Sequence, residues 1–204
     1  MPNLSAGGGR MSYEINIKLG LYCGLSESQA AALLKLHDGG KIHQNQFKSF
    51  VASGLVVAQK DQVNKQACTF TDTGSEIFSR MWAIQNRLGT FVPMESKFTP
   101  DELNALAQNA GRLARKALPK QLGLRAAHMK VLVEVGRHPG IVIGALLKNF
   151  GADEVGLLLA RNLVGGSDDV LPSARGARYT SLHLETKALS LLNWCLNEIK
   201  LAGE

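Results

Sequence analysis

The chain of 204 residues is 45% hydrophobic and 20% charged, which is typical of a folded protein and excludes global disorder. No run reaches the roughly 18 apolar residues of a membrane-spanning helix, and the first residues lack the apolar centre of a secretory signal. Three cysteines without paired spacing, Cys23, Cys68 and Cys195, indicate reduced thiols. We therefore expect a cytoplasmic protein with no membrane partner, in which Gly-rich residues 1–11 form a flexible leader.

The net charge of +6 is concentrated in one segment, residues 112–137. Seven basic residues lie there against Glu134 alone: Arg112, Arg115, Lys116, Lys120, Arg125, Lys130 and Arg137. A local excess of this kind suits a polyanion, because each neutralised phosphate releases a condensed counterion. The segment therefore favours a nucleic-acid partner, although a solvated helix face would look the same.

In chain order, the first half begins with two predicted helices. Ser26 and Gln29 have the spacing of a capping box, and Gly39-Gly40 ends the helix that follows. A second helix is predicted over residues 42–52, ending at Gly54. Its apolar face consists of Phe47, Phe50 and Val51.

Two short strands and a helix complete the first half. Residues 55–59 and 67–71 are rich in β-branched and aromatic side chains, and the polar stretch between them predicts a hairpin. Thr73 and Glu76 then have the spacing of a second capping box, which opens a helix through Leu88.

The clearest helix start in the chain is Thr99-Pro100-Asp101-Glu102, which combines a Thr cap, a Pro at the first position and a Glu three residues after the cap. The predicted helix runs to about Leu118. We therefore place a linker at residues 93–98, between a first unit at 12–92 and a second at 99–204.

The second unit continues with a helix over residues 124–135 and a turn at His138-Pro139-Gly140. Two short helices, 141–150 and 152–163, are predicted next. A polar loop from Gly165 leads to a strand at 179–184 and a closing helix at 185–201. The fold class we expect is mainly α with small β-hairpin wings, arranged as two winged-helix-like units in tandem.

Several stretches of the second unit follow a known pattern: 131–135, the turn 137–141, Leu146-Leu147, Tyr179 and the return 182–188. Through these stretches the second unit resembles the winged-helix domain of MarR-type transcriptional regulators. In the first unit, 54–57 and 70–76 are similar to the strand, wing and helix exit of the same family. The resemblance implies a dimeric DNA-binding protein that reads a pseudo-palindromic site, with a small-molecule effector that no residue here identifies.

Two departures from that family pattern concern the helices. The first unit has one predicted helix, not two, between its opening helix and its hairpin, so we expect a shortened unit. In the second unit, the helix expected to enter DNA has Asp153 and Glu154 at its start, which repel phosphate. Its exposed Leu157 would instead suit a protein-binding surface.

The second helix of the first unit is the better candidate for reading DNA. Its outward residues are expected to be Gln44, Asn45, Lys48 and Ser49, with His43 and Gln46 at the flanks. Gln and Asn form bidentate pairs with adenine, and Lys reaches guanine or phosphate. The wings would add Lys60, Gln62, Asn64 and Lys65 in the first unit, and Arg175 and Arg178 in the second.

No catalytic or metal motif is present, so we expect no enzyme activity, no cofactor and no bound metal. The function that the sequence favours is a sequence-specific double-stranded-DNA-binding regulator, dimerised through residues 11–21 and 185–201. Two alternatives remain open: a winged-helix adaptor that binds other proteins, and a plasmid or phage replication initiator with tandem winged helices.

Overall fold

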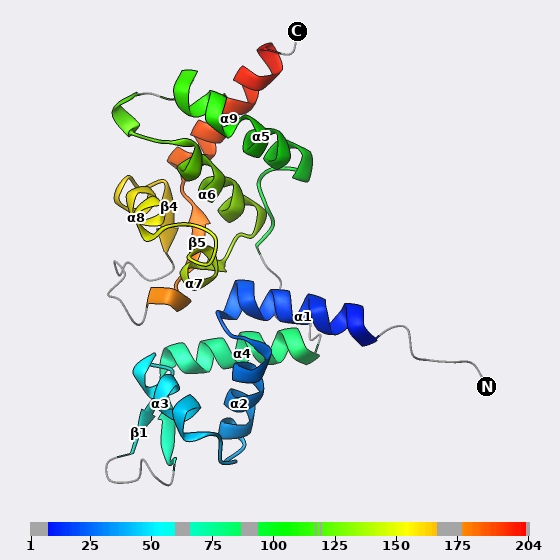
Figure 1. Ribbon diagram of the computed structural model, residues 1–204, viewed down its shortest axis with the longest axis vertical. Helices are drawn as coiled ribbons and strands as arrows, with labels where there is room; N and C mark the ends of the chain where they lie inside the picture. Colours follow the sequence, from blue (N-terminus) through cyan, green and yellow to red (C-terminus); the bar gives the residue numbers. More distant parts are fainter. Residues whose placement is uncertain are drawn as a thin grey trace, which may run out of the picture. The chain divides into compact units, whose positions relative to one another are not determined.

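The computed structural model describes residues 8–59, 66–86, 94–116, 118, 120–166 and 177–202. The fold is mainly helical with two small antiparallel sheets, which confirms the expected class in this general form. The chain divides into two compact units (Figure 1). Unit 1 comprises Met1–Val92 with Pro172–Tyr179, and unit 2 comprises Pro93–Leu171 with Thr180–Glu204. Among the described helices, none is both long and apolar enough to cross a membrane.

Unit 1 contains four helices and a hairpin within the residues that the structure describes. In chain order these elements are α1 (Gly8–Cys23), α2 (Glu27–His37), α3 (Gln44–Ala52), β1 (Val56–Ala58), β2 (Cys68–Phe70) and α4 (Asp72–Asn86). β1 and β2 pair antiparallel, with Val57 opposite Thr69. Helix α1 lies beside α4, and α3 packs against β1 (Figure 1).

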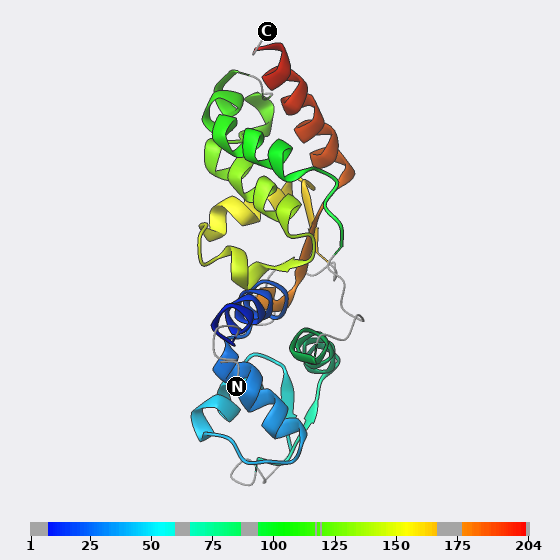
Figure 2. The ribbon, with the colours of Figure 1, turned by 90° about the vertical axis from the view of Figure 1, so that its right-hand side faces the viewer.

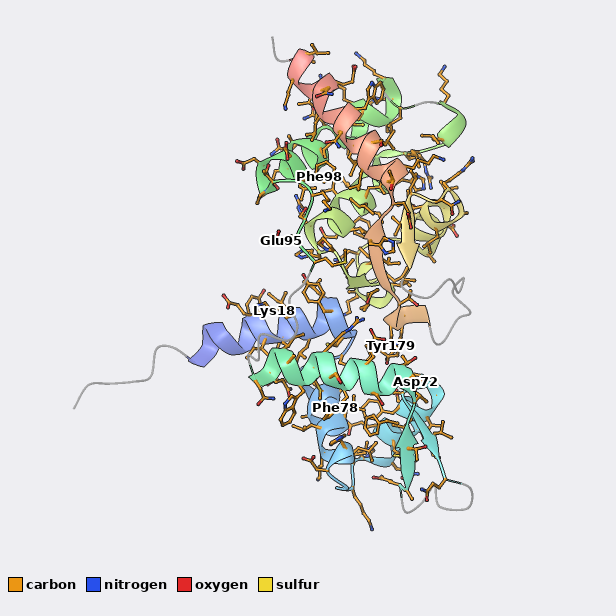
Figure 3. All side chains as sticks on the ribbon, turned by 180° about the vertical axis from the view of Figure 1, so that it is seen from behind. Lys18, Asp72, Phe78, Glu95, Phe98 and Tyr179 are labelled. Atoms are coloured by element: carbon orange, nitrogen blue, oxygen red, sulfur yellow. The ribbon has the colours of Figure 1, made fainter. Side chains whose placement is uncertain are left out.

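The core of unit 1 draws one apolar face from each of these elements. Phe47 and Phe50 of α3 are buried, as the sequence pattern predicts, whereas Val51 is half-buried. Tyr179, from the short 3-10 helix Ala177–Tyr179, belongs to the same core. Along α4 (Figure 3), Phe78 stacks on His37 of α2 with ring centroids 4.1 Å apart.

Helix α1 was not expected from the sequence. It begins at Gly8, so its first turn lies within the segment assigned to a leader. Because α1 precedes α2, two helices and not one separate the opening helix of unit 1 from its hairpin. The helix count expected for a shortened unit is therefore wrong. Burial of Leu19, Tyr22 and Cys23 on one side of α1 stabilises a helix of weak intrinsic propensity.

One of the two capping boxes predicted in unit 1 is present and the other is wrong. At α2, the Ser26 hydroxyl accepts from the Gln29 N–H and the Gln29 side chain accepts from the Ser26 N–H. At α4, the cap is Thr71 and not Thr73: its Oγ1 accepts from the Gly74 N–H at 2.9 Å and donates to the Gly54 carbonyl at 2.6 Å. Helix α4 consequently begins at Asp72, beside the hairpin (Figure 3).

Unit 2 has a helical layer and a three-stranded sheet. Its elements are α5 (Pro100–Lys116), the 3-10 helix η2 (Lys120–Leu122), α6 (Ala126–Arg137), β3 (Ile141–Val142), α7 (Ile143–Leu146), α8 (Ala152–Ala160), β4 (Val164–Gly166), β5 (Ser181–Leu184) and α9 (Thr186–Leu201). The strand order is β3-β5-β4, antiparallel throughout. Helix α5 packs on α6 and α9, and α9 runs along the unit in Figure 2.

The start of α5 is as predicted, because Thr99 and Glu102 form the reciprocal capping bonds. Two strands of unit 2 were missed. Ile141–Val142 was assigned to a helix, and Gly165 and Gly166 of β4 to a loop, yet both segments pair with β5. Each strand has three residues or fewer, too short for an alternating pattern to appear.

Candidate nucleic-acid interface

Helix α3 presents a polar stripe to solvent. Asn45, Lys48 and Ser49 are exposed, at the three- and four-residue spacing that puts side chains on one face of a helix. The opposite face carries buried Phe47 and Phe50. The structure therefore brings together the outward residues expected from the sequence. Gln44 is the exception, because its side chain is half-buried.

His43 has a structural role at the beginning of α3. It is the N-cap residue, and its Nδ1 accepts the Asn45 backbone N–H at 3.3 Å. This nitrogen must be unprotonated to accept that bond. The ring is exposed, so it borders the polar stripe while holding the first turn in place.

A residue that the sequence analysis did not single out connects the hairpin to α3. Gln66 precedes β2, with a φ of 57°. Its Oε1 accepts from the Ile42 N–H at 2.8 Å, and its Nε2 donates to the Ile42 carbonyl at 2.7 Å. The same Nε2 donates to Oε1 of Gln44 at 3.2 Å. A contact across 24 residues leaves no local sequence signal.

The segment of sequence that contains α3 is positively charged. Residues 35–65 contain five lysines and two aspartates, a net charge of +3, whereas the remainder of residues 1–92 is balanced, with four basic and four acidic side chains. Helix α3 itself contains Lys48 and no acidic residue. An anionic partner would thus meet no like charge on this helix.

Most of the wing residues expected from the sequence lie outside the residues that the structure describes. Lys60, Gln62, Asn64, Lys65 and Arg175 lie outside the described residues. Arg178 is described and exposed, in the segment grouped with unit 1. Its guanidinium lies over the Tyr179 ring, 4.7 Å from the centroid, and donates to the Tyr179 hydroxyl.

The basic segment of unit 2 is spread along two helices. Arg115 and Lys116 are exposed in the last turn of α5, Arg112 is half-buried one turn earlier, and Lys120 is exposed in η2. Arg125 and Arg137 flank opposite ends of the 12-residue helix α6, about 18 Å apart at 1.5 Å per residue. The seven cations therefore do not meet at a single point.

Several of these cations already have acidic or polar neighbours. Arg125 lies 3.5 Å from Glu154 of α8, and Arg137 lies 3.5 Å from Glu134. Arg137 also donates to Oδ1 of Asn104 at 2.7 Å. A hollow of about 250 Å³ is lined by Arg112, Leu113, Lys116, Glu198 and Ala202, so a carboxylate shares it with two cations. Such pairs reduce the positive potential that the sequence alone indicates.

Helix α8 of unit 2 differs from α3 in its exposed face. Asp153 is exposed there and Glu154 is half-buried, whereas Val155, Leu158 and the nearby Leu163 are buried. Leu157 is half-buried, so it does not form the exposed apolar contact that would favour an adaptor. An acidic first turn remains unfavourable for contact with phosphate.

The histidines are placed among structural partners. His138 and His183 lie 3.6 Å from Glu134 and 3.2 Å from Glu185 respectively. His128 is buried, and its Nδ1 accepts the Arg125 N–H at 2.8 Å. Within the described residues, no group of three or more His, Cys, Asp and Glu side chains is arranged to hold a metal ion.

Comparison of the chain with models of known families, with curated proteins and with solved structures gives no match.

Proposed function

We propose that the chain is a sequence-specific regulator of transcription that binds double-stranded DNA through two winged-helix-like units. In unit 1, α2 and α3 would form the helix–turn–helix, α3 would enter the major groove, and the β1–β2 hairpin would be the wing. The observation that carries the proposal is the stripe of Asn45, Lys48 and Ser49, which is exposed and free of acidic residues. Side chains of these types reach base edges and phosphates.

Order and spacing of the elements support this assignment. Gly39, with a φ of 76°, ends α2 and permits a short turn before α3. The hairpin then follows α3 after Gly54, whose φ is 72°. Unit 2 has the corresponding order of α6, β3, α7, α8, β4 and β5. Its acidic α8 suits a supporting role, in which the cations at the end of α5 contact the phosphate backbone.

We further propose that the regulator is a homodimer. Large apolar side chains are exposed on both terminal helices: Tyr13 (67%) and Ile17 (42%) on α1, and Trp194 (40%) and Leu201 (68%) on α9. A second copy would bury such side chains, and a two-fold dimer would read a pseudo-palindromic site. Sedimentation equilibrium of the full chain and of Trp194→Ala measures the oligomeric state, with weaker self-association expected for the variant.

Selection of fragments from a random duplex library by the full chain tests the DNA-binding function. We expect a preferred sequence, and affinity that falls steeply with added salt. The combined variant Gln44→Ala, Asn45→Ala and Lys48→Ala should lose the sequence preference and keep a weaker, salt-dependent binding.

A matched control carries the same residue types on exposed positions of unit 2: Gln108→Ala, Asn193→Ala and Lys148→Ala. It should keep the preferred sequence. Absence of salt-dependent duplex binding by the full chain would contradict the proposal. An unchanged preferred sequence in the α3 variant would remove α3 as the reading helix.

A further inference from the structure

The amide of Gln66 has a defined orientation. One of its ends accepts a backbone N–H, from Ile42 at 2.8 Å, and the other donates to the carbonyl of the same residue at 2.7 Å. A backbone N–H only donates and a carbonyl only accepts, so the first end must be Oε1 and the second Nε2. The ambiguity between oxygen and nitrogen that affects most glutamine side chains is therefore absent here.

This orientation determines that of Gln44. Nε2 of Gln66 uses its remaining hydrogen to donate to the Gln44 side chain at 3.2 Å, so the end of Gln44 that faces it must be Oε1. Nε2 of Gln44 has no hydrogen-bond partner among the described residues. Gln44 is half-buried rather than buried, and its Oε1 faces Gln66. The end of the Gln44 amide that is left for a partner is thus a donor.

We infer that Gln44 is a specificity-determining residue that donates a hydrogen bond to an acceptor on a major-groove base edge. The inference rests on the proposed function. The acceptors available in the groove are purine N7, guanine O6 and thymine O4, whereas cytosine presents an N4 amino donor. Gln44 therefore selects against cytosine at the position it faces. Gln66 is a positioning residue, because it prevents the amide of Gln44 from turning its oxygen outward.

Replacing the donor by an acceptor tests the inference. Gln44→Glu keeps an oxygen for the Gln66 amide and presents a second oxygen to the groove. Gln46→Glu is the matched control, since it adds the same charge to the same helix at a residue that takes no part in the hydrogen bonds between Gln66 and Gln44. The full-length chain first selects its preferred duplex, and every base pair of that duplex is then replaced in turn.

At one base pair we expect Gln44→Glu to shift the ratio of affinities toward cytosine by about tenfold, a typical value for one base-edge contact. Gln46→Glu should weaken binding to all duplexes by the same factor. Gln66→Ala should reduce the wild-type preference at that same base pair, because the amide of Gln44 is then free to turn. Circular dichroism of each variant establishes that it is folded. If Gln66→Ala does not fold, the comparison of Gln44→Glu with Gln46→Glu decides the result.

The outcomes separate this inference from the function on which it rests. If the wild-type chain selects a duplex but Gln44→Glu changes no base-pair preference beyond the change in Gln46→Glu, the inference is wrong and the proposed function stands. If the wild-type chain selects no sequence, both are wrong.

Discussion

Gln66 and Ile42 exchange two hydrogen bonds across 24 residues of sequence, and these bonds join the end of the first hairpin loop to the residue two positions before α3. Neither residue lies in a regular element. The backbone of Ile42 is satisfied by a side chain, much as a strand partner would satisfy it. The position of the first turn of α3 therefore depends on a residue near β2.

Gln66→Ala should lower the free energy of unfolding by about 1–3 kcal/mol, because it leaves the part-buried N–H and carbonyl of Ile42 without their partner. Urea unfolding followed by circular dichroism measures the change. Gln46→Ala, at a half-buried position of α3 that takes no part in this exchange, is the control and should cost less than about 0.5 kcal/mol. Equal losses in the two variants would show that the exchange with Ile42 contributes little.

Gly74→Ala should destabilise unit 1 by about 1–3 kcal/mol or more. Gly74 is buried in the first turn of α4, and a Cβ there would collide with the carbonyl oxygen of Leu55. That oxygen accepts the Thr71 N–H at 3.1 Å, so it has little freedom to move. Thermal unfolding of the variant measures the loss.

Gly111→Ala provides the opposite case for comparison. Gly111 is also helical, in α5, but a Cβ there meets nothing within 4 Å. Alanine is favoured over glycine in a helix interior by up to about 1 kcal/mol, so this substitution should be neutral or stabilising. If Gly74→Ala and Gly111→Ala lose a similar amount of stability, the collision with the Leu55 carbonyl is not the cause of the loss.

Features that depend on neighbouring residues could be predicted from the sequence. The caps at Ser26 and Thr99 require partners three residues away, and both are present. The buried face of α3 follows from apolar spacing, which a helix converts directly into one side. These predictions needed no knowledge of tertiary structure.

Features that depend on distant contacts could not be predicted in the same way. Thr71 displaces Thr73 as the cap of α4 because its hydroxyl also reaches the carbonyl of Gly54, 17 residues earlier. Helix α1 contains β-branched and glycine residues, and it is stabilised by packing on α4 rather than by propensity. The orientation of Gln44 depends in turn on Gln66, which no local pattern marks.

Lys48→Ala should weaken binding to all duplexes by a similar factor and reduce the slope of log K against log salt by about 1, because one phosphate contact is lost. Lys48 is exposed on the stripe of α3. Lys148→Ala removes an exposed lysine from unit 2 and serves as the control with an unchanged slope. Fluorescence anisotropy at several salt concentrations measures both slopes. Identical slopes in the wild type and Lys48→Ala would place this lysine away from the DNA.

The three thiols should differ in reactivity. Burial raises the pKa of Cys23 to about 12 and that of Cys195 to about 11, and both side chains are fully buried. Burial also raises the pKa of Cys68, but this residue is only half-buried. A thiol reagent at pH 8 should therefore label Cys68 first, and the other two only on unfolding. Cys68→Ser should abolish the early phase, and a rapid phase that persists in this variant would contradict the assignment.

Stability should fall as the pH drops below about 6.5, because of His128. Burial lowers the pKa of His128 below its ordinary value of 6.5, the Arg125 guanidinium lowers it further, and Glu154 opposes both. Between the lowered pKa and 6.5, the unfolded chain binds more protons than the folded one. The free energy of unfolding contributed by this group is thus complete above 6.5 and is lost as the pH falls toward the lowered pKa.

His128→Gln should remove this pH dependence and keep the fold, because a glutamine oxygen at this position can accept the Arg125 N–H that Nδ1 accepts now. The part of the slope of unfolding free energy against pH that disappears is at most about 1.4 kcal/mol per pH unit, the value for one proton. Urea unfolding between pH 5 and 8 measures it in the wild type, in His128→Gln and in His138→Gln. His138 is half-buried next to Glu134, and its replacement should leave the contribution of His128 intact. If His128→Gln retains the full slope, the proton that destabilises the fold is bound elsewhere.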